Sequence, residues 1–131
     1  MSGLKKLKIF VSGSRSVSQL TQDFCHYLTA FTLSNETILV GDASGVDKLV
    51  QAFLNDLDYR NVIVYHAYSY PRNNLGKWET VGNFSSYIEK DKAMGDMCNA
   101  GLALWDGSSK GTKRNYTQLK KMKKLFIMTL A

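Results

Sequence analysis

Three short turns rich in glycine, serine and threonine carry the residues best suited to bind an anion. They read GSRS at 13–16, GDASG at 41–45 and DGSSKGT at 106–112. Each follows an apolar run and precedes a helical pattern, so we expect unpaired backbone N–H groups there beside hydroxyl side chains. Phosphate and carboxylate groups bind at such helix starts. None of the turns is a Walker A loop or a GxGxxG fingerprint, so the inference requires that they lie together.

Individual side chains of these turns suit individual parts of a ligand. Arg15 suits bidentate binding of a phosphate, and Asp42 suits the hydroxyl groups of a ribose. Asp47 falls in the first turn of an expected helix, which Ser44 is placed to cap. The candidate ligand-binding residues are Gly13, Ser14, Arg15, Gly41, Asp42, Ala43, Ser44, Gly45, Asp47, Asp106, Gly107, Ser108, Gly111 and Thr112.

Five apolar runs separated by helical patterns must position these turns. Strands are predicted at 8–12, 37–41, 62–66, 100–105 and 125–130, and helices at 19–31, 46–57, 84–98 and around Tyr116, Leu119 and Met122. Strands that alternate with helices predict a mainly parallel sheet covered on both faces. The fold class is therefore α/β, a Rossmann-like three-layer α/β/α sandwich with a five-stranded sheet in the order 3-2-1-4-5.

In an open parallel sheet, ligands bind beyond the carboxyl ends of the strands, at the point where the strand order reverses. For the order 3-2-1-4-5, this point lies between the first and fourth strands. All three turns follow strands, so they fall at this edge of the sheet. We therefore expect them to form one site.

The segment 67–83 fits neither a helix nor a strand pattern and is predicted to be a long loop. It holds the only proline, together with several asparagine and aromatic residues. Long loops in small domains often act as lids, so Arg72, Asn74 and Trp78 are candidate lid residues. The alternative is a surface loop held in place by its aromatic side chains.

The chain has 131 residues, which is the size of one domain. No run approaches the roughly 20 apolar residues that cross a bilayer, so we expect a cytoplasmic protein with no membrane partner. Cys25 and Cys98 lack a CxxC partner and are expected to be free thiols. We expect no metal site and no bound cofactor.

The formal net charge is +6, and the excess lies near the end of the chain. Seven basic residues stand between Lys110 and Lys124, and no acidic residue follows Asp106. Such a run forms either a solvated helix face or a basic surface beside an anion site. Nucleic acid is the less favoured partner, because the run holds little aromatic side chain beyond Tyr116.

Three segments carry a resemblance to a known family. They are KIFVSGSRS at 8–16, ILVGDASGVDKLVQAFL at 38–54 and EKDKAMGDMCNAGLALWDGSSKGTKRNYTQLKK at 89–121. They resemble the SLOG superfamily of Rossmann-like domains, and within it the YspA-like, DUF2493-type branch. The resemblance implies that 1–131 is a single domain that binds a nucleotide or nucleotide-derived ligand. It also implies self-association, so we expect a dimer or larger homo-oligomer.

Some members of this superfamily are phosphoribohydrolases, which release a base from a nucleoside monophosphate. Their PGGxGTxxE segment carries a catalytic glutamate, and Asn115 stands at that position after Gly111 and Thr112. An amide cannot act as a general acid or base at neutral pH. Glu89 or Asp91 are the candidate replacements, although both also fit a solvated helix face.

Three functions follow as expectations. The first is binding or sensing of a nucleoside phosphate, an ADP-ribose-like compound or a nucleotide sugar. The second is an N-glycosidase, and the third is a single-stranded nucleic-acid-binding accessory protein, as in one branch of the superfamily. The Gly/Ser turns and Arg15 favour the first function. The second is less favoured, because no complete set of catalytic residues is evident.

Overall fold

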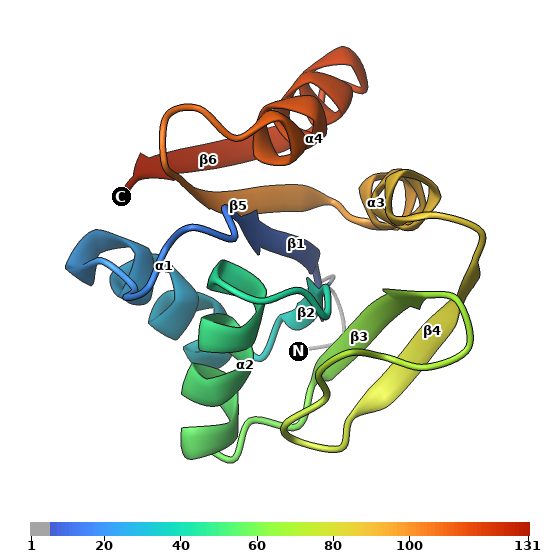
Figure 1. Cartoon of the computed structure of the whole chain (residues 1–131). Helices are drawn as coiled ribbons and strands as arrows, with labels where there is room; N and C mark the ends of the chain where they lie inside the picture. The colour runs from blue at the N-terminus through green and yellow to red at the C-terminus, as the bar shows by residue number, and fades with distance from the viewer. Residues whose placement is uncertain (1–5) are drawn as a thin grey trace.

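Within residues 6–131, which a computed structural model describes, six strands form one parallel sheet and four helices cover it (Figure 1). The strands are β1 (Lys8–Gly13), β2 (Thr37–Val40), β3 (Val62–Ala67), β4 (Glu79–Phe84), β5 (Ala100–Trp105) and β6 (Leu125–Leu130). The helices are α1 (Gln22–Leu33), α2 (Val46–Asp56), α3 (Tyr87–Met97) and α4 (Lys110–Lys121). None of these helices has the length and apolar character needed to cross a membrane.

The sheet has the order β4-β3-β2-β1-β5-β6, and all five strand pairs are parallel. The α/β class, the parallel sheet and the relative order of the five predicted strands are confirmed. β1 is central, because it pairs with β2 on one side and with β5 on the other. The strand order therefore reverses between β1 and β5, and the turns after these strands lie at that point.

The predicted number of strands is wrong, because β4 forms inside the segment that was expected to be a loop. Its sequence ETVGNF is polar, and its side chains are exposed or only partly buried. An edge strand pairs on one side only, so it does not need the apolar run of a central strand. Gly82 is required here, because a Cβ atom would lie 2.0 Å from the His66 ring of β3.

Two apolar layers separate the sheet from its helices. On one face Ile9 and Val11 of β1 pack with Phe24 of α1 and Val50 of α2. On the other face Phe10 packs in a smaller cluster of residues from the α3 and α4 side of the sheet. Ser12 follows Phe10 by two residues in β1, so its side chain also faces the α3 and α4 side.

Two helix starts and one helix cap differ from the predicted ones. α1 begins at Gln22 rather than at Gln19, whereas α2 begins at Val46 as predicted. α3 begins at Tyr87 rather than at Phe84, which ends β4, and the Ser86 hydroxyl caps α3 by accepting from the Glu89 N–H at 3.1 Å. The N-cap of α2 is Gly45 and not the predicted Ser44. Gly45 has a φ of +77°, a conformation that residues with a Cβ atom rarely adopt.

Candidate functional site

The three turns meet at the carboxyl edge of the sheet, and Ser14 joins them. Its N–H donates to the Leu104 carbonyl oxygen of β5 at 3.1 Å, and its carbonyl oxygen accepts from the Val46 N–H of α2 at 3.3 Å. Its hydroxyl accepts from the Asp106 N–H at 3.0 Å and lies 2.9 Å from the Ser109 hydroxyl. Ser14 is only 1% exposed. Its main role is therefore to hold the turns together.

Gly45 brings the first two turns into direct contact. A Cβ atom at this position would lie 2.4 Å from Cα and 2.6 Å from the carbonyl oxygen of Arg15. Only a residue without a side chain allows the backbones to approach so closely. The close approach of these two turns thus depends on Gly45, which does not itself line the pocket.

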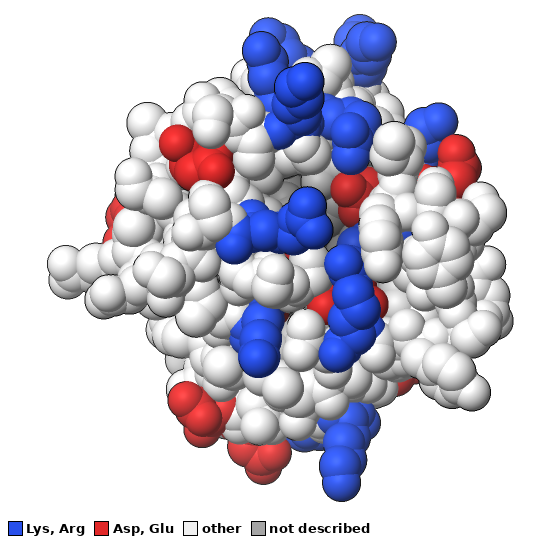
Figure 2. All heavy atoms as spheres, in the orientation of Figure 1, with Lys and Arg blue, Asp and Glu red and all other residues white. Residues whose placement is uncertain are grey.

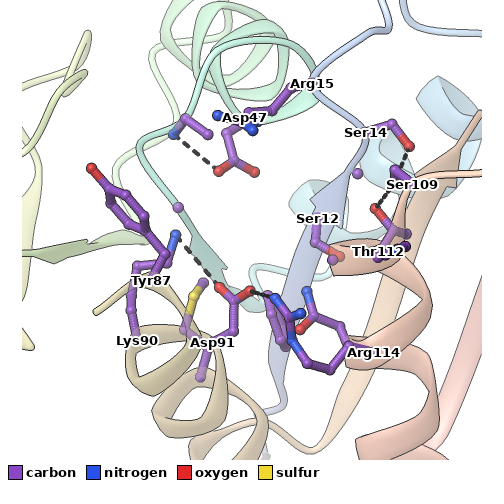
Figure 3. A pocket seen from close by; sticks show the side chains of 18 of the residues that line it. Ser12, Ser14, Arg15, Asp47, Tyr87, Lys90, Asp91, Ser109, Thr112 and Arg114 are labelled. Carbon is purple, nitrogen blue, oxygen red and sulfur yellow. Dashed lines mark hydrogen bonds and ion pairs between the residues drawn. The ribbon is translucent and has the colours of Figure 1, made fainter. Parts of the chain in front are cut away.

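A pocket of about 480 Å³ opens between these turns on the α3 and α4 side of the sheet (Figure 3). Its lining residues come from β1, α2, α3 and α4, from the turns after β1, β2 and β5, and from the loop after β3. They are Phe10, Ser12, Gly13, Ser14, Arg15, Gly41, Ala43, Asp47, Arg72, Tyr87, Lys90, Asp91, Met94, Ser109, Lys110, Gly111, Thr112, Arg114 and Asn115.

The start of α4 forms one end of the pocket and has the properties of an anion site. Its N-cap residue Ser109 makes no side-chain capping bond, and the first turn holds no acidic residue. Lys110, Gly111 and Thr112 line the pocket there, so their N–H groups are available to a ligand. The Ser109 hydroxyl instead donates to the Thr112 hydroxyl at 3.1 Å.

Two acidic side chains project into the opposite parts of the pocket, Asp47 from α2 and Asp91 from α3 (Figure 3). Asp47 accepts from the Ala43 N–H at 3.1 Å. Burial raises the pKa of Asp47 to about 6, although the charge of Lys90 and the Ala43 N–H oppose this. Asp47 therefore titrates closer to neutral pH than an exposed aspartate.

Asp91 lies between two cations. Its carboxylate oxygens are 3.5 Å from Lys90 Nζ and 4.0 Å from Arg114. Burial raises the pKa of Asp91, and this effect exceeds the opposing charges of Lys90 and Arg114. Lys90 is itself only 4% exposed and also lies 3.9 Å from Asp42. The acidic and basic side chains therefore form one connected network.

Asp42 belongs to this network but does not line the pocket. It accepts from the Arg72 N–H and from the Arg72 guanidinium, both at 2.7 Å. Burial raises the pKa of Asp42, but the hydrogen bonds and charge of Arg72 outweigh burial and leave this pKa below its usual value. Asp42 thus holds Arg72, whose guanidinium lies 4.0 Å from the centre of the Tyr87 ring.

Two buried oxygen atoms of the pocket have no hydrogen-bond partner within residues 6–131. They are Oγ of Ser12, a residue 7% exposed, and Oδ1 of Asn115, a residue 5% exposed. Native proteins rarely leave buried polar atoms without a partner, because such atoms lose their bonds to water. Both residues line the same pocket. A bound molecule is the simplest partner for them.

Basic side chains surround the pocket. Figure 2 shows Lys and Arg around a hollow, acidic side chains within it, and further basic side chains over α4. Five basic and two acidic side chains line the pocket, and Asp42 lies behind it. The three negative charges of these carboxylates cancel three of the five positive charges, so two positive charges remain. Arg15 and Lys110 make no ion pair in the described part of the chain.

Some predicted site residues lie outside the pocket lining. Asp106 organises its own turn, because it accepts from the Ser108 and Ser109 N–H groups at 2.9 and 2.8 Å and from the Ser16 hydroxyl at 2.6 Å. These bonds hold the pKa of Asp106 well below its usual range. The other predicted residues that do not line it are Asp42, Ser44, Gly45, Gly107, Ser108, Glu89, Asn74 and Trp78.

The candidate lid residues have separate positions. Arg72 lines the pocket, whereas Trp78 is 5% exposed and packs in the core under α1 and α2. The Trp78 indole N–H donates to the Tyr59 carbonyl oxygen at 2.8 Å, and Asn74 bonds to both backbone groups of Trp78. Trp78 and Asn74 therefore fit the alternative prediction, a surface loop held in place by its aromatic side chains.

Several lining residues were not predicted from the sequence, and the clearest case is α3. Tyr87, Lys90, Asp91 and Met94 follow the spacing i, i+3, i+4 and i+7, which places them on one face of a helix. The charges on this segment favour a solvated face, so of these four residues only Asp91 is among the predicted site residues. Charged residues at the spacing of a buried stripe were the signal that could have found Lys90.

No family model, no curated protein and no solved structure matches the chain. The class of the protein therefore rests on its own coordinates, which define a Rossmann-like α/β domain with a polar pocket at the reversal of strand order. Within residues 6–131, no group of three or more His, Cys, Asp or Glu side chains is arranged to hold a metal ion. The basic side chains of the pocket and the helix start of α4 suit an anion.

Proposed function

We propose that this protein binds or senses a nucleotide or nucleotide-derived ligand in the pocket over β1. The observation that carries the proposal is the meeting of two features in one cavity. The uncapped start of α4 offers N–H groups beside Lys110, and the buried Ser12 and Asn115 oxygens lack hydrogen-bond partners within the described residues. A phosphate bonds to the first group, and a polar organic moiety bonds to the second.

Charge and volume agree with such a ligand. The two positive charges that remain after the network is paired suit the charge of a phosphate monoester near neutral pH. Binding pockets for small organic ligands typically measure roughly 300–1,000 Å³, and this pocket has about 480 Å³. The resemblance of the turns to the SLOG superfamily supports the same class of ligand.

The test is thermal unfolding of the full chain with AMP, ADP-ribose, NAD and a nucleotide sugar. A ligand at a hundredfold excess over its Kd stabilises the folded state by about 2.7 kcal/mol, and the effect grows with concentration. Arg15→Ala should weaken binding about tenfold without changing the unfolding of the free protein, because Arg15 is exposed and unpaired within the described residues.

Lys48→Ala is the matched control. Lys48 is exposed on α2 and does not line the pocket, so the variant loses the same charge without losing a ligand contact. It should bind as the wild type does. If none of the four compounds stabilises the protein at millimolar concentration, the proposal is wrong.

One observation favours a second candidate function, hydrolysis of the N-glycosidic bond. Asp91 lines the pocket and lies beside Asn115, whose amide lowers the Asp91 pKa by hydrogen bonding. Asn115 stands where hydrolases of the superfamily carry glutamate, so Asp91 offers a carboxylate near that place. Glu89 is exposed and pairs with Lys92 at 3.6 Å, so it does not reach the pocket.

In this function Asp91 accepts a proton from a water molecule, which attacks the C1′ atom of the ribose as the bond to the base breaks. The base takes its proton from solvent water, and Asp91 later returns its own proton to solvent. Before it accepts that proton, the Asp91 carboxylate stabilises the positive charge of the sugar in the transition state. Chromatography of AMP incubated with the protein measures released adenine. Asp91→Asn should abolish release while Glu89→Gln retains it, and an absence of adenine from the wild type rejects hydrolysis of AMP.

A further inference from the structure

The pocket holds two chemically different ends. N–H groups and Lys110 line the pocket at the start of α4, whereas oxygen acceptors line other parts of it on α2, α3 and α4. These acceptors are the Asp47 and Asp91 carboxylates and Asn115 Oδ1. A ligand that fills both ends must carry an anion and, next to it, groups that donate hydrogen bonds.

The acceptors have spare capacity. Asp47 receives one hydrogen bond, from the Ala43 N–H, although a carboxylate accepts up to about four. The oxygens of Asp91 lie 3.5 and 4.0 Å from their cations, and the Asn115 amide also bonds to this carboxylate, so at least one of its roughly four acceptor positions remains. Asn115 Oδ1 receives none within the part of the chain that the structure describes.

The missing donors are neutral. Three carboxylates, Asp42, Asp47 and Asp91, already face Arg72, Lys90 and Arg114. A further cation would therefore add to a pocket that is positive overall. Hydroxyl groups donate hydrogen bonds without bringing charge, and Ser12 Oγ can also exchange bonds with them.

The geometry of α4 sets the distance between the two ends. Thr112 and Asn115 are three residues apart on this helix, so their side chains lie on the same face with a rise of about 4.5 Å. In a nucleotide the sugar ring lies directly next to the phosphate. A phosphate bound at Gly111 and Thr112 thus places a sugar beside Asn115.

We propose that the sugar is recognised through its hydroxyl groups, and that the protein binds ribonucleotides in preference to 2′-deoxyribonucleotides. This inference rests on the proposed nucleotide-binding function and names the class of ligand within it. Asp91 and Asn115 accept from the 2′ and 3′ hydroxyls. A 2′-deoxy ligand leaves one of these buried acceptors without a partner, and such a loss lowers affinity strongly.

The experiment compares AMP, GMP, CMP and UMP with their 2′-deoxy counterparts, dAMP, dGMP, dCMP and dUMP, by isothermal titration calorimetry on the full chain. Within each pair, the base and the phosphate are the same. In each pair that binds, the ribonucleotide should bind at least about tenfold more tightly than its 2′-deoxy counterpart. Asn115→Leu keeps the approximate shape of the side chain and removes its acceptor, so it should reduce this ratio mainly by weakening the ribonucleotide.

The outcomes separate the two proposals. Equal affinities within the pairs overturn the inference and leave nucleotide binding intact, whereas no binding by any of the eight compounds overturns nucleotide binding itself. The wild-type ratio needs no variant, so the test does not depend on the folding of Asn115→Leu. Glu89→Gln, on the exposed part of α3, should keep the wild-type ratio. A change there as large as that of Asn115→Leu contradicts the assignment of Asn115.

Discussion

Ser12 and Ser14 are both buried at the end of β1, and they differ in their hydrogen bonds. Ser12 Oγ has no partner within residues 6–131, whereas Ser14 joins three turns. Ser12→Ala should leave the free energy of unfolding unchanged or raise it by up to about 1 kcal/mol, because it removes a buried unpaired hydroxyl. The same variant should bind nucleotide more weakly.

Ser14→Ala is the control for this prediction, because it removes a hydroxyl that accepts from Asp106 N–H. It should lower the free energy of unfolding by about 1–2 kcal/mol. Denaturant unfolding of the two ligand-free variants measures both values. If Ser12→Ala lowers the free energy of unfolding as much as Ser14→Ala does, the Ser12 hydroxyl has a partner in the ligand-free protein and is not kept for a ligand.

Asp47 makes the stability depend on pH. Its pKa is about 6 in the folded protein and 3.8 as the reference, so its stabilising contribution is complete below about pH 4. As the pH rises through 6, the unfolded chain gives up the proton more readily and this contribution is lost. The free energy of unfolding of the wild type, relative to Asp47→Asn, should fall by about 3 kcal/mol between pH 4 and 7. A difference that stays constant in urea titrations over this range contradicts the assignment.

At the scale of elements, the contact between the turns after β1 and β2 depends on Gly45. Gly45→Ala forces a strained conformation and also a clash of Cβ with the Arg15 backbone. Strain alone costs about 1–3 kcal/mol, and the clash adds to it because backbone atoms cannot move aside. The variant should unfold at lower denaturant concentration and bind nucleotide more weakly.

Gly107→Ala separates the loss of stability caused by backbone strain from the loss caused by the clash. Gly107 also has a positive φ, of +89°, but no atom lies within 4 Å of the position of a Cβ. This variant should lose only the stability that strain removes and should keep its affinity for nucleotide. Equal losses in the two variants would show that the contact with Arg15 does not build the site.

The sequence predicts the elements whose pattern is simple. β1, β2, β3 and β5 are apolar runs that are buried on both faces, so their residue types alone indicate strands. β4 was missed because its sequence is polar, and its pairing with β3 comes from the tertiary fold. Strand order then brings the three turns together, which residue spacing alone could not prove.

The inner part of the site was harder to predict than its turns. Lys90 and Asp91 look like residues of a solvated face, because charged side chains seldom face a buried stripe. Lys90 is buried and Asp91 is partly buried here, since each lies near an opposite charge from another element. Ser12 at the end of an apolar strand gives no sign of its role in the sequence, because only the folded arrangement shows that its hydroxyl lacks a partner within residues 6–131.

At the scale of the whole molecule, the charge is uneven, and the basic side chains of α4 continue outward from the pocket (Figure 2). A mononucleotide in the pocket releases few counterions, so its affinity should fall only several-fold between 50 and 200 mM salt. A nucleic acid along α4 would meet many basic residues, and its affinity should fall by about 10³-fold or more. Titration of AMP and of a single-stranded oligonucleotide at both salt concentrations distinguishes these modes.

The central claim is that the start of α4 binds the phosphate of a nucleotide. A crystal structure of the protein with AMP tests it most directly. The account predicts a phosphate within hydrogen-bond distance of the Gly111 and Thr112 N–H groups, with the ribose against Asn115 and Asp91. An empty pocket at saturating AMP, or AMP bound elsewhere with this end of α4 vacant, would contradict the account.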